Sequence, residues 1–407
     1  MNTRRIRPAA LDAGEAVRPG RLGVSRNVVT LGVVSFFADI SSEMLYPLIP
    51  LFLQTTLGAP VAAIGLIEGV AEATASITRI LGGALADRTR RRIPFVFLGY
   101  ATTAVGKVLL ALSVVWPMAL LARFVDRLGK GVRTGPRDAL LADSARVQDR
   151  GRAFGFHRSM DTAGAVIGPL GAVGLLVAFH NHLRPIFWLA LIPGVLSVLA
   201  VLPLREVRRE SRSGERLRIG ITGRQFAVFL GIFTLFAATN SSDVFLILRA
   251  RSLGLSEALV VLAYVLYNVV YMILSLPAGI ASDRIGRRNV LAVGLVLFAA
   301  VYVGFTVIRH SAWVWPLFLV YGGYIALTDG VAKALISDLV PAETRATAIG
   351  TFAAATGISA LIASVTAGIL WQVVGAWAPF AMGAAGAGLA AVLLITLLPA
   401  RVAHQAA

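Results

Sequence analysis

The sequence predicts an all-α integral membrane protein of twelve transmembrane helices, arranged as two pseudo-symmetric lobes of six helices each. Three observations favour this fold class. Apolar residues make up 57% of the 407-residue chain and the mean hydropathy is +0.78, which is more than a soluble core of this size can bury. Apolar stretches of roughly 20 residues, long enough to cross a bilayer as helices, recur along the chain. The second half of the chain also repeats motifs of the first.

The predicted spans follow in chain order. Those of the first half lie near 28–53, 61–85, 93–115, 117–142, 156–180 and 185–204. Those of the second half lie near 225–249, 256–281, 290–308, 313–340, 348–373 and 377–399. The segment between the halves is long, polar and basic, as a linker would be. We therefore expect a tail at 1–26, a first lobe at 27–204, a linker at 205–224, a second lobe at 225–399 and a tail at 400–407.

The distribution of basic residues predicts the orientation. Of the 38 Lys and Arg residues, 25 fall in the tails and connections on one side of the predicted spans. The opposite side has only four, at Arg184, Arg249, Arg251 and Arg309. Because cytoplasmic loops carry the excess of basic residues, we expect both termini in the cytoplasm and the protein in the inner membrane. The formal charge of +17 then reflects topology, and we expect no nucleic-acid partner.

Several chemistries lack the residues they need. The chain has no cysteine, which excludes disulfides, thiolate metal sites and cysteine nucleophiles. It also has no Walker loop, no metalloprotease helix and no recognisable nucleophile triad. We therefore expect no enzymatic activity and no cofactor, so that an ion gradient would supply the energy for transport.

Three segments recur in the second half at an offset near 195 to 200 residues. Ser41-Ser42-Glu43 in the first span corresponds to Ser241-Ser242-Asp243 in the seventh. The segment 83–92 (GALADRTRRR) between spans two and three corresponds to 279–288 (GIASDRIGRR) between spans eight and nine. The third pair is Asp143 and Asp338, at the ends of spans four and ten.

These segments, together with twelve spans and a basic central connection, resemble the major facilitator superfamily over residues 28–399. One departure is Arg90, where the family usually has a glycine, which the second copy keeps as Gly286. The resemblance implies a secondary transporter in which two lobes rock around a central site.

Span five adds a feature of one branch of this family. It contains Gly164-x-x-x-Gly168-Pro169, which is similar to a motif of the proton-coupled antiporters. The last two glycines of that motif fall here on Ala172 and Val173. This resemblance implies a drug-exporter-like antiporter. The alternative is an ordinary small-residue packing face, which such glycines also form.

The duplicated segments are candidates for a gate. Their glycines would let helices approach closely, and their aspartates lie at helix ends where they can pair with arginines. The resemblance adds Asp143 and Asp338 as relay partners. The alternative is that the arginines only orient the protein. The candidate gating residues are Gly83, Asp87, Arg88, Arg91, Asp143, Gly279, Asp283, Arg287 and Asp338.

Span four has an unusual number of charges. Its basic residues are spaced 4, 3, 3 and 4 apart, which places them on one face of a helix. On a lipid-facing surface, five cations at roughly 3 kcal/mol each would cost about 15 kcal/mol. We therefore expect this face to line a cavity or to meet carboxylates. The charged residues are Arg123, Asp126, Arg127, Lys130, Arg133, Arg137 and Asp138.

Carboxylates elsewhere in the spans are the expected partners. The acids and bases of the first-half spans nearly balance, which favours a paired network in which a carboxylate takes up a proton when its partner moves away. The alternative is a static structural network. The candidate substrate-binding and proton-coupling residues are Asp39, Glu43, Glu68, Glu72, Arg123, Asp126, Arg127, Lys130, Arg133, Asp161 and Asp243.

We expect a monomeric, multi-pass transporter that moves a small solute by alternating access, with proton-coupled export, and whose partners are membrane lipid, the solute or ion, and protons. A divalent metal exporter would use Asp39, Glu43, Glu68, Glu72 and His157 as ligands. We assign no metal site, because no His-rich tract or Met cluster accompanies these acids, and we expect His157 at a helix end. The remaining alternatives are an uptake symporter of an anionic or zwitterionic solute and a receptor or scaffold that does not transport.

Overall fold

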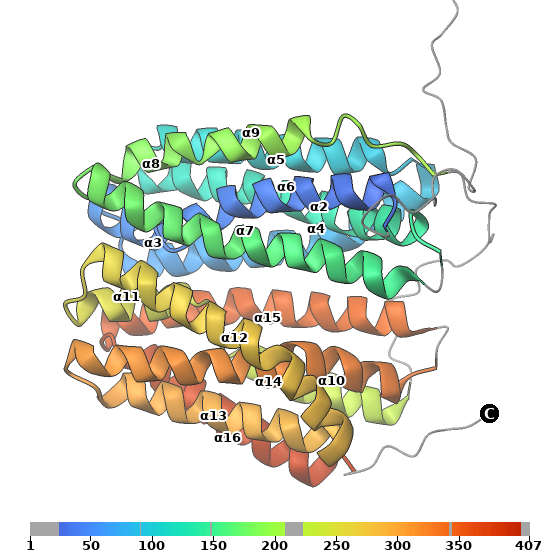
Figure 1. Ribbon diagram of the computed structural model, residues 1–407. Helices are drawn as coiled ribbons and strands as arrows, with labels where there is room; N and C mark the ends of the chain where they lie inside the picture. Colours follow the sequence, from blue (N-terminus) through green and yellow to red (C-terminus); the bar gives the residue numbers. More distant parts are fainter. Residues whose placement is uncertain (1–23, 90, 147–148, 208–222, 342–343, 400–407) are drawn as a thin grey trace, which may run out of the picture.

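The computed structural model describes residues 24–89, 91–146, 149–207, 223–341 and 344–399. The predicted tails, except residues 24–26, and most of the predicted linker lie outside the described residues. Every regular element that the structure describes is helical. Figure 1 shows the helices as two stacked groups, with the first half of the chain in one and the second half in the other. The prediction of an all-helical, multi-span fold is confirmed.

Some helices of the first lobe join into one span. α2, α3 and the π-helix η1 follow one another as the first span, and α8 and α9 form the sixth. The bounds are α2 Arg26–Leu45, α3 Ile49–Leu51, η1 Phe52–Thr56, α4 Val61–Thr89, α5 Ile93–Leu112, α6 Trp116–Asp143, α7 Arg150–Ala178, α8 Leu183–Leu189 and α9 Leu191–Leu199.

The second lobe repeats this plan. α10 and α11 together form the seventh span, and the short 3-10 helix η3 leads into α14. The bounds are α10 Arg224–Ala237, α11 Val244–Ser252, α12 Glu257–Ile285, α13 Arg287–Val307, η3 Ser311–Trp313, α14 Val314–Leu339, α15 Arg345–Val373 and α16 Ala378–Leu397.

Length and composition alone identify nine membrane-spanning helices among the described residues. The other three predicted spans do not meet this criterion of length and composition, each for a different reason. α6 has too many charged residues, the sixth span is short at Leu183–Leu199, and the seventh is interrupted between α10 and α11. The span predicted near 225–249 therefore consists of two helices with a break at its centre. The break contains Ser241 and Ser242, and the Ser242 backbone N–H donates to Ser364 Oγ at 3.3 Å, as expected where polar groups replace helical hydrogen bonds within a membrane.

Helix pairing is the same in both lobes. In the first, α2 packs on α7 and α9, α4 on α6, and α5 on α6 and α9. In the second, α10 packs on α15 and α16, α12 on α14, and α13 on α14 and α16. The lobes meet through α4 against α15 and α7 against α12. The sequence repeat therefore corresponds to a structural repeat around a shared axis.

We call the side on which α2 begins and α16 ends the linker face, and the opposite side the far face. Near the far face the lobes pack tightly. A Cβ at Gly65 would overlap the backbone oxygen of Ser364, and one at Gly368 would lie 2.8 Å from Ala62 Cα. Only residues without a side chain allow this approach of α4 and α15. The lobes are therefore closed toward the far face.

Candidate functional site

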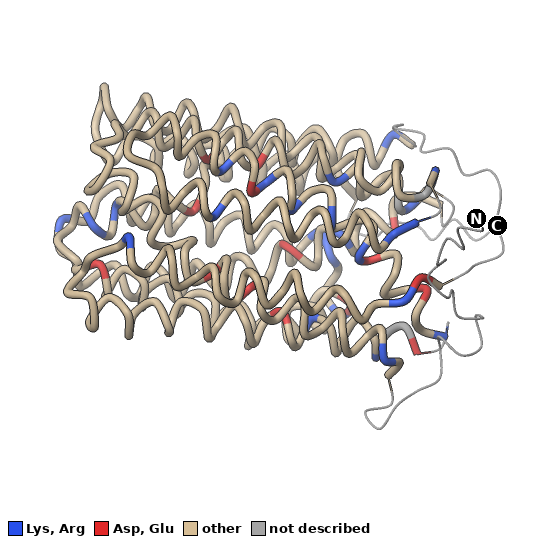
Figure 2. Tube along the Cα trace, turned by 90° about the horizontal axis from the view of Figure 1, so that it is seen from above, with Lys and Arg blue, Asp and Glu red and all other residues tan. Residues whose placement is uncertain are grey.

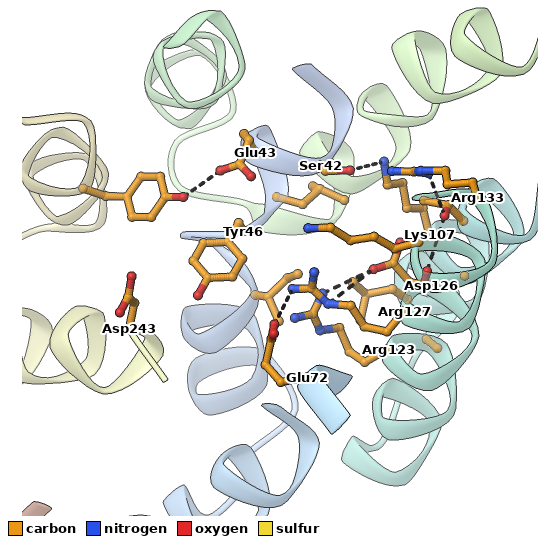
Figure 3. Close-up of a pocket in the computed structure, with 18 of the residues that line it drawn as sticks. Ser42, Glu43, Tyr46, Glu72, Lys107, Arg123, Asp126, Arg127, Arg133 and Asp243 are labelled. Atoms are coloured by element: carbon orange, nitrogen blue, oxygen red, sulfur yellow. Dashed lines mark hydrogen bonds and ion pairs between the residues drawn. The ribbon is translucent and has the colours of Figure 1, made fainter. Parts of the chain in front are cut away.

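A cavity of about 250 Å³ lies between the lobes. Its walls come from α2, α4, α5 and α6 of the first lobe and from α12 and the break in the seventh span of the second (Figure 3). Figure 2 shows charged residues at the ends of the helices and again at mid-depth within the bundle. The charged residues that line the cavity are Glu43, Glu72, Lys107, Arg123, Asp126, Arg127, Lys130, Arg133 and Asp243.

The basic face of α6 points into the first lobe. The residues Arg123, Arg127 and Arg133 are 3%, 6% and 4% exposed, although each has a charged head group. Glycines bring the neighbouring helix this close, since a Cβ at Gly106 of α5 would lie 2.6 Å from the backbone nitrogen of Asp126. Helix α5 therefore covers the charged face of α6 and shields it from lipid.

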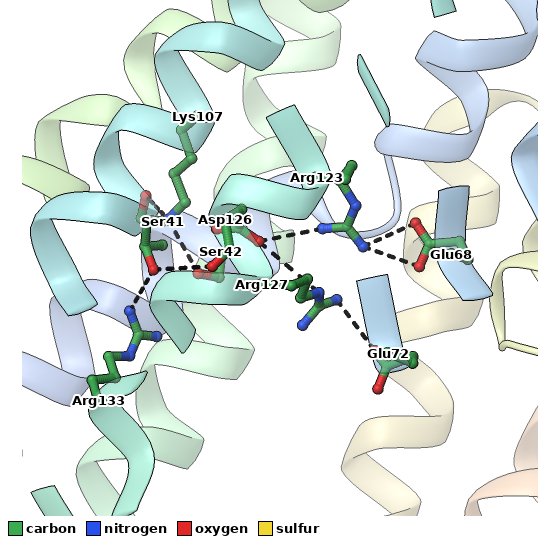
Figure 4. A network of polar contacts seen from close by, with 10 residues as sticks. Ser41, Ser42, Glu68, Glu72, Lys107, Arg123, Asp126, Arg127 and Arg133 are labelled. Atoms are coloured by element: carbon green, nitrogen blue, oxygen red, sulfur yellow. Dashed lines mark hydrogen bonds and ion pairs between the residues drawn. The ribbon is translucent and has the colours of Figure 1, made fainter. Parts of the chain in front are cut away.

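Two arginines of α6 form ion pairs with α4 (Figure 4). Arg123 Nη2 donates to both carboxylate oxygens of Glu68, at 2.9 and 3.0 Å. Arg127 Nη2 lies 3.6 Å from Glu72 Oε1. Asp126 lies between the arginines, 3.5 Å from Arg123 Nη1 and 4.0 Å from Arg127 Nε. Three carboxylates therefore surround two arginines, so both cations have full counter-charges.

Two other cations of the cavity, Lys107 and Arg133, have neutral partners. Lys107 Nζ donates to Ser41 Oγ at 2.6 Å and to Ser42 Oγ at 3.1 Å. Arg133 Nη1 donates to Thr103 Oγ1 at 3.0 Å, and its guanidinium lies 4.1 Å from the centre of the Tyr100 ring. Among the described residues, no carboxylate lies within 4 Å of Lys107, Lys130 or Arg133. Lys107 is a site residue that the sequence reasoning missed.

Two acids face these cations across the cavity. Glu43 accepts a hydrogen bond from Tyr264 OH at 2.6 Å. Asp243 accepts from Tyr267 OH at 3.1 Å and from Tyr321 OH at 2.5 Å. The repeated Ser-Ser-acid segment thus places one carboxylate from each lobe at the cavity (Figure 3).

Sequence reasoning also missed these tyrosines. On α12, Tyr264, Tyr267 and Tyr271 are spaced three and four residues apart, which is the spacing of one helix face. This row of tyrosines on one helix face is the sequence pattern that could have indicated a polar contact surface on α12.

Asp39 and Asp161 meet at a second place, between α2 and α7. A Cβ at Gly164 would lie 3.0 Å from Asp39 Cβ and 2.5 Å from the backbone oxygen of Phe36, so this glycine lets the two helices touch. Asp161 lies three residues before Gly164 on α7, so the two carboxyl groups share this helix contact. Two carboxyl groups so close together disfavour a double negative charge, which favours a proton on one of the two.

The surroundings of this pair include further charges. Arg158 Nη1 lies 3.3 Å from Asp161 Oδ2. His157 is 5% exposed and its Nε2 lies 2.8 Å from Ser35 Oγ. The expectation that His157 lies at a helix end is wrong, because α7 begins at Arg150 and buries His157 against α2.

A polar contact joins the lobes beside this pair. Arg158 Nη2 of α7 donates to Tyr271 OH of α12 at 3.4 Å. Tyr271 OH in turn donates to Asp329 Oδ2 of α14 at 3.1 Å, and Lys333 pairs with Asp329 at 2.8 Å. The Arg158 side chain is 65% exposed. We refer to Arg158, Tyr271 and Asp329 as the lobe bridge.

Some of the candidate gating residues form ion pairs, and others are exposed. Asp143 pairs with Arg92, the neighbour of the predicted Arg91, whereas Arg88 and Arg91 are exposed. In the second lobe, Arg287 pairs with Asp338 at 2.6 Å and with Asp283 at 3.5 Å. These pairs lie within single lobes. The side chain of Asp87 lies outside the described residues.

The motif glycines do not serve the packing role expected of them. Nothing lies within 4 Å of the position that a Cβ would take at Gly83 or Gly279. In contrast, a Cβ at Gly168 would lie 2.7 Å from the backbone oxygen of Ile40. Gly164 and Gly168 lie about one helical turn apart on α7 and both face α2, and Pro169 lies within α7. The glycines of span five therefore form the close helix contact.

The likeness to known proteins agrees with this architecture. The Major Facilitator Superfamily profile matches residues 31–227 and 228–407. An uncharacterised MFS-type transporter of Methanocaldococcus jannaschii is 36% identical over 358 residues, which cover 86% of this chain and 89% of the relative. The multidrug resistance protein MdtH of Photorhabdus laumondii is 32% identical over only 140 residues, 34% of this chain and 33% of that protein.

Solved structures show the same fold. The crystal structure of the nucleoside transporter NupG superposes with a TM-score of 0.76 over 91% of this chain and 99% of its own, at 14% identity. The duplicated lobes, the central cavity and the family match lead to one conclusion. This multi-pass membrane protein belongs to the major facilitator superfamily of secondary transporters and is not an enzyme.

Proposed function

We propose that this transporter exports a small solute across the inner membrane in exchange for protons, with its linker face in the cytoplasm. The observation that carries the proposal is the meeting of Asp39 and Asp161 at the contact of α2 with α7, where a Cβ at Gly164 would lie 3.0 Å from Asp39 Cβ. Two carboxyl groups held together bind one proton between them more readily than they accept two negative charges. The pair is therefore our candidate for the proton-carrying group.

The lobe bridge supports a link between this proton and the motion of the lobes. Arg158 contacts Asp161 and, across the lobe boundary, Tyr271. When the lobes separate at α7 and α12, Arg158 loses Tyr271 and keeps Asp161, so its guanidinium is no longer shared with the second lobe and compensates an ionised Asp161 better. Proton release and lobe movement would then favour each other, as a coupled two-state equilibrium requires.

Two further observations support direction and orientation. The partial likeness to the multidrug resistance protein MdtH favours export. The 25 basic residues counted on one side of the spans favour a cytoplasmic linker face. The same residues would also serve uptake by symport, so the direction is decided by the transport assay below.

The first test measures the proton directly and needs no substrate. Infrared difference spectra of the purified protein, recorded as the pH is raised, should show the loss of a protonated carboxyl band. Asp39→Asn and Asp161→Asn should each remove this band, whereas Asp138→Asn, outside the pair, should retain it. An unchanged band in both variants contradicts the proposal.

The second test measures transport. Proteoliposomes containing a pH-sensitive dye receive small anionic, zwitterionic, neutral and cationic solutes one at a time under an imposed pH gradient. We expect one class of solute to exchange for protons with wild-type protein, and Asp39→Asn to abolish this flux while solute-for-solute exchange persists. Cotransport in the same direction as the protons would replace export with symport.

A further inference from the structure

Cations exceed acids on the wall of the cavity that α5 and α6 form. Arg123 and Arg127 are paired with carboxylates. Lys107, Lys130 and Arg133 line the same cavity, and none has a carboxylate within 4 Å among the described residues. Of these three, Lys107 is 5% exposed and Arg133 is 4% exposed, so water does not solvate them as it does surface cations.

Lys107 and Arg133 are also held by neighbouring side chains. The Ser41 hydroxyl donates to the Ala190 backbone oxygen at 2.5 Å, which leaves its oxygen to accept from Lys107. The Arg133 guanidinium is held by Thr103 and the Tyr100 ring. Hydroxyl groups hold the cations but supply no negative charge. A buried cation without a counter-charge is unfavourable, and a bound anion would relieve it through charge-assisted hydrogen bonds.

The side of the cavity toward the second-lobe tyrosines has the reverse character. Glu43 of α2 and Asp243 of the second lobe lie there, and each accepts hydrogen bonds from tyrosines. A carboxylate has about four acceptor positions, so both acids retain capacity for a donor on a solute. The cavity therefore has a cationic wall and an acidic wall, separated by the space that the solute would occupy (Figure 3).

The size of the cavity restricts the solute further. Its volume is about 250 Å³, whereas pockets for drug-sized ligands measure roughly 300–1,000 Å³. The cavity thus fits a compact polar solute better than a bulky apolar one. The solute that the cavity fits is therefore smaller and more polar than the cargo that the drug-exporter resemblance implies.

We propose that the transported solute is a small anion or zwitterion whose carboxylate or phosphate group binds between Lys107, Lys130 and Arg133. In a zwitterion, the ammonium group would face Glu43 and Asp243. This inference rests on the proposed function, because it names the cargo of the same cavity.

The test measures ligand-induced thermal stabilisation of the purified full-length protein. The anionic probes are succinate, glutamate and inorganic phosphate, and the controls are putrescine as a cation and glucose as a neutral solute. We expect saturable stabilisation by at least one anionic probe and none by putrescine or glucose. Comparing succinate and glutamate with phosphate shows whether the site binds a carboxylate or a phosphate group. Comparing glutamate with succinate shows whether an ammonium group contributes to binding.

Variants test the position of the anion. Lys107→Gln should weaken binding about tenfold or more, as expected for loss of a hydrogen bond to a charged group. Lys107→Arg, which keeps the charge, should bind within a few-fold of wild type and controls for folding. Arg309→Gln removes an exposed cation outside the cavity and should bind as wild type does.

Three results would overturn this inference: stabilisation by none of the anionic probes, equal stabilisation by putrescine, or unchanged binding to a folded Lys107→Gln protein. The result of the anion-binding test can be distinguished from the result of the infrared test of the proton site. Anion binding that depends on Lys107, together with an unchanged infrared band in the aspartate variants, supports the cargo and contradicts the proton site. The reverse pattern contradicts the cargo alone.

Discussion

At the scale of single residues, the ion pair between Arg123 and Glu68 shows how burial changes the role of a charge. Their side chains are 4% and 1% exposed, so each depends on the other for compensation. Surface pairs contribute roughly 0–1 kcal/mol, but removing one partner of a buried pair is far more costly. The lobe bridge, with Arg158 65% exposed, is a contact of the weakly stabilising kind, as the proposed separation of α7 from α12 requires.

We predict that Glu68→Gln destabilises the protein by about 3–5 kcal/mol, because Arg123 then keeps only its longer contact with Asp126. The double variant Glu68→Gln with Arg123→Met should recover much of this loss, since it removes the unpaired charge. Thermal unfolding of the purified proteins, monitored by intrinsic fluorescence, measures both. A single variant as stable as wild type would show that the pair contributes little.

At the scale of helices, the contact between α4 and α15 determines which conformation is stable. Gly65, Gly69 and Gly368 lie along this seam near the far face, where any side chain would meet the backbone or side chains of the other lobe. Alternating access requires this seam to open and close. Substitutions here should therefore shift the balance between conformations more than they change any ligand contact.

We predict that Gly65→Val disfavours the conformation closed at the far face, because its side chain would overlap the Ser364 backbone oxygen. The absence of native cysteines allows a clean readout with Ser42→Cys in the cavity. Its labelling by an impermeant maleimide from the far face should increase severalfold in Gly65→Val. Gly174→Val serves as the control, since nothing lies within 4 Å of that position. Equal labelling in all three backgrounds would contradict this role of the seam.

At the scale of the whole molecule, duplication and charge asymmetry determine the arrangement in the membrane. The two lobes pair their helices in the same pattern, and an even number of spans returns the chain to the face from which it began. The predicted topology puts the basic connections on that linker face, and cytoplasmic loops carry such an excess of basic residues. The orientation of the whole protein is therefore open to a direct test.

We predict that His182→Cys and Arg309→Cys react with an impermeant maleimide in intact cells, because both positions lie in connections on the far face. Arg91→Cys should react only after the membrane is permeabilised, since it lies on the linker face. Reaction of Arg91→Cys in intact cells would reverse the topology and, with it, the proposed direction of export.

The amino-acid sequence was enough to predict the fold class, the duplication, the resemblance to the superfamily and the inward direction of the charged face of α6. These features depend on composition, on spacing within one helix and on motif repetition, all of which a linear chain displays. The lipid environment makes the α6 prediction strong, because no other orientation of five cations is energetically acceptable.

Which charges meet becomes visible only in the folded protein. Glu68 pairs with Arg123 and Glu72 with Arg127, while Lys107 and Arg133 are left with hydroxyl partners. Such contacts depend on the depth, rotation and separation of helices that are distant in sequence, and glycines such as Gly106 and Gly164 set those separations. A balanced count of acids and bases carries no information about these distances, which is why the sequence predicted a network but could not assign its pairs.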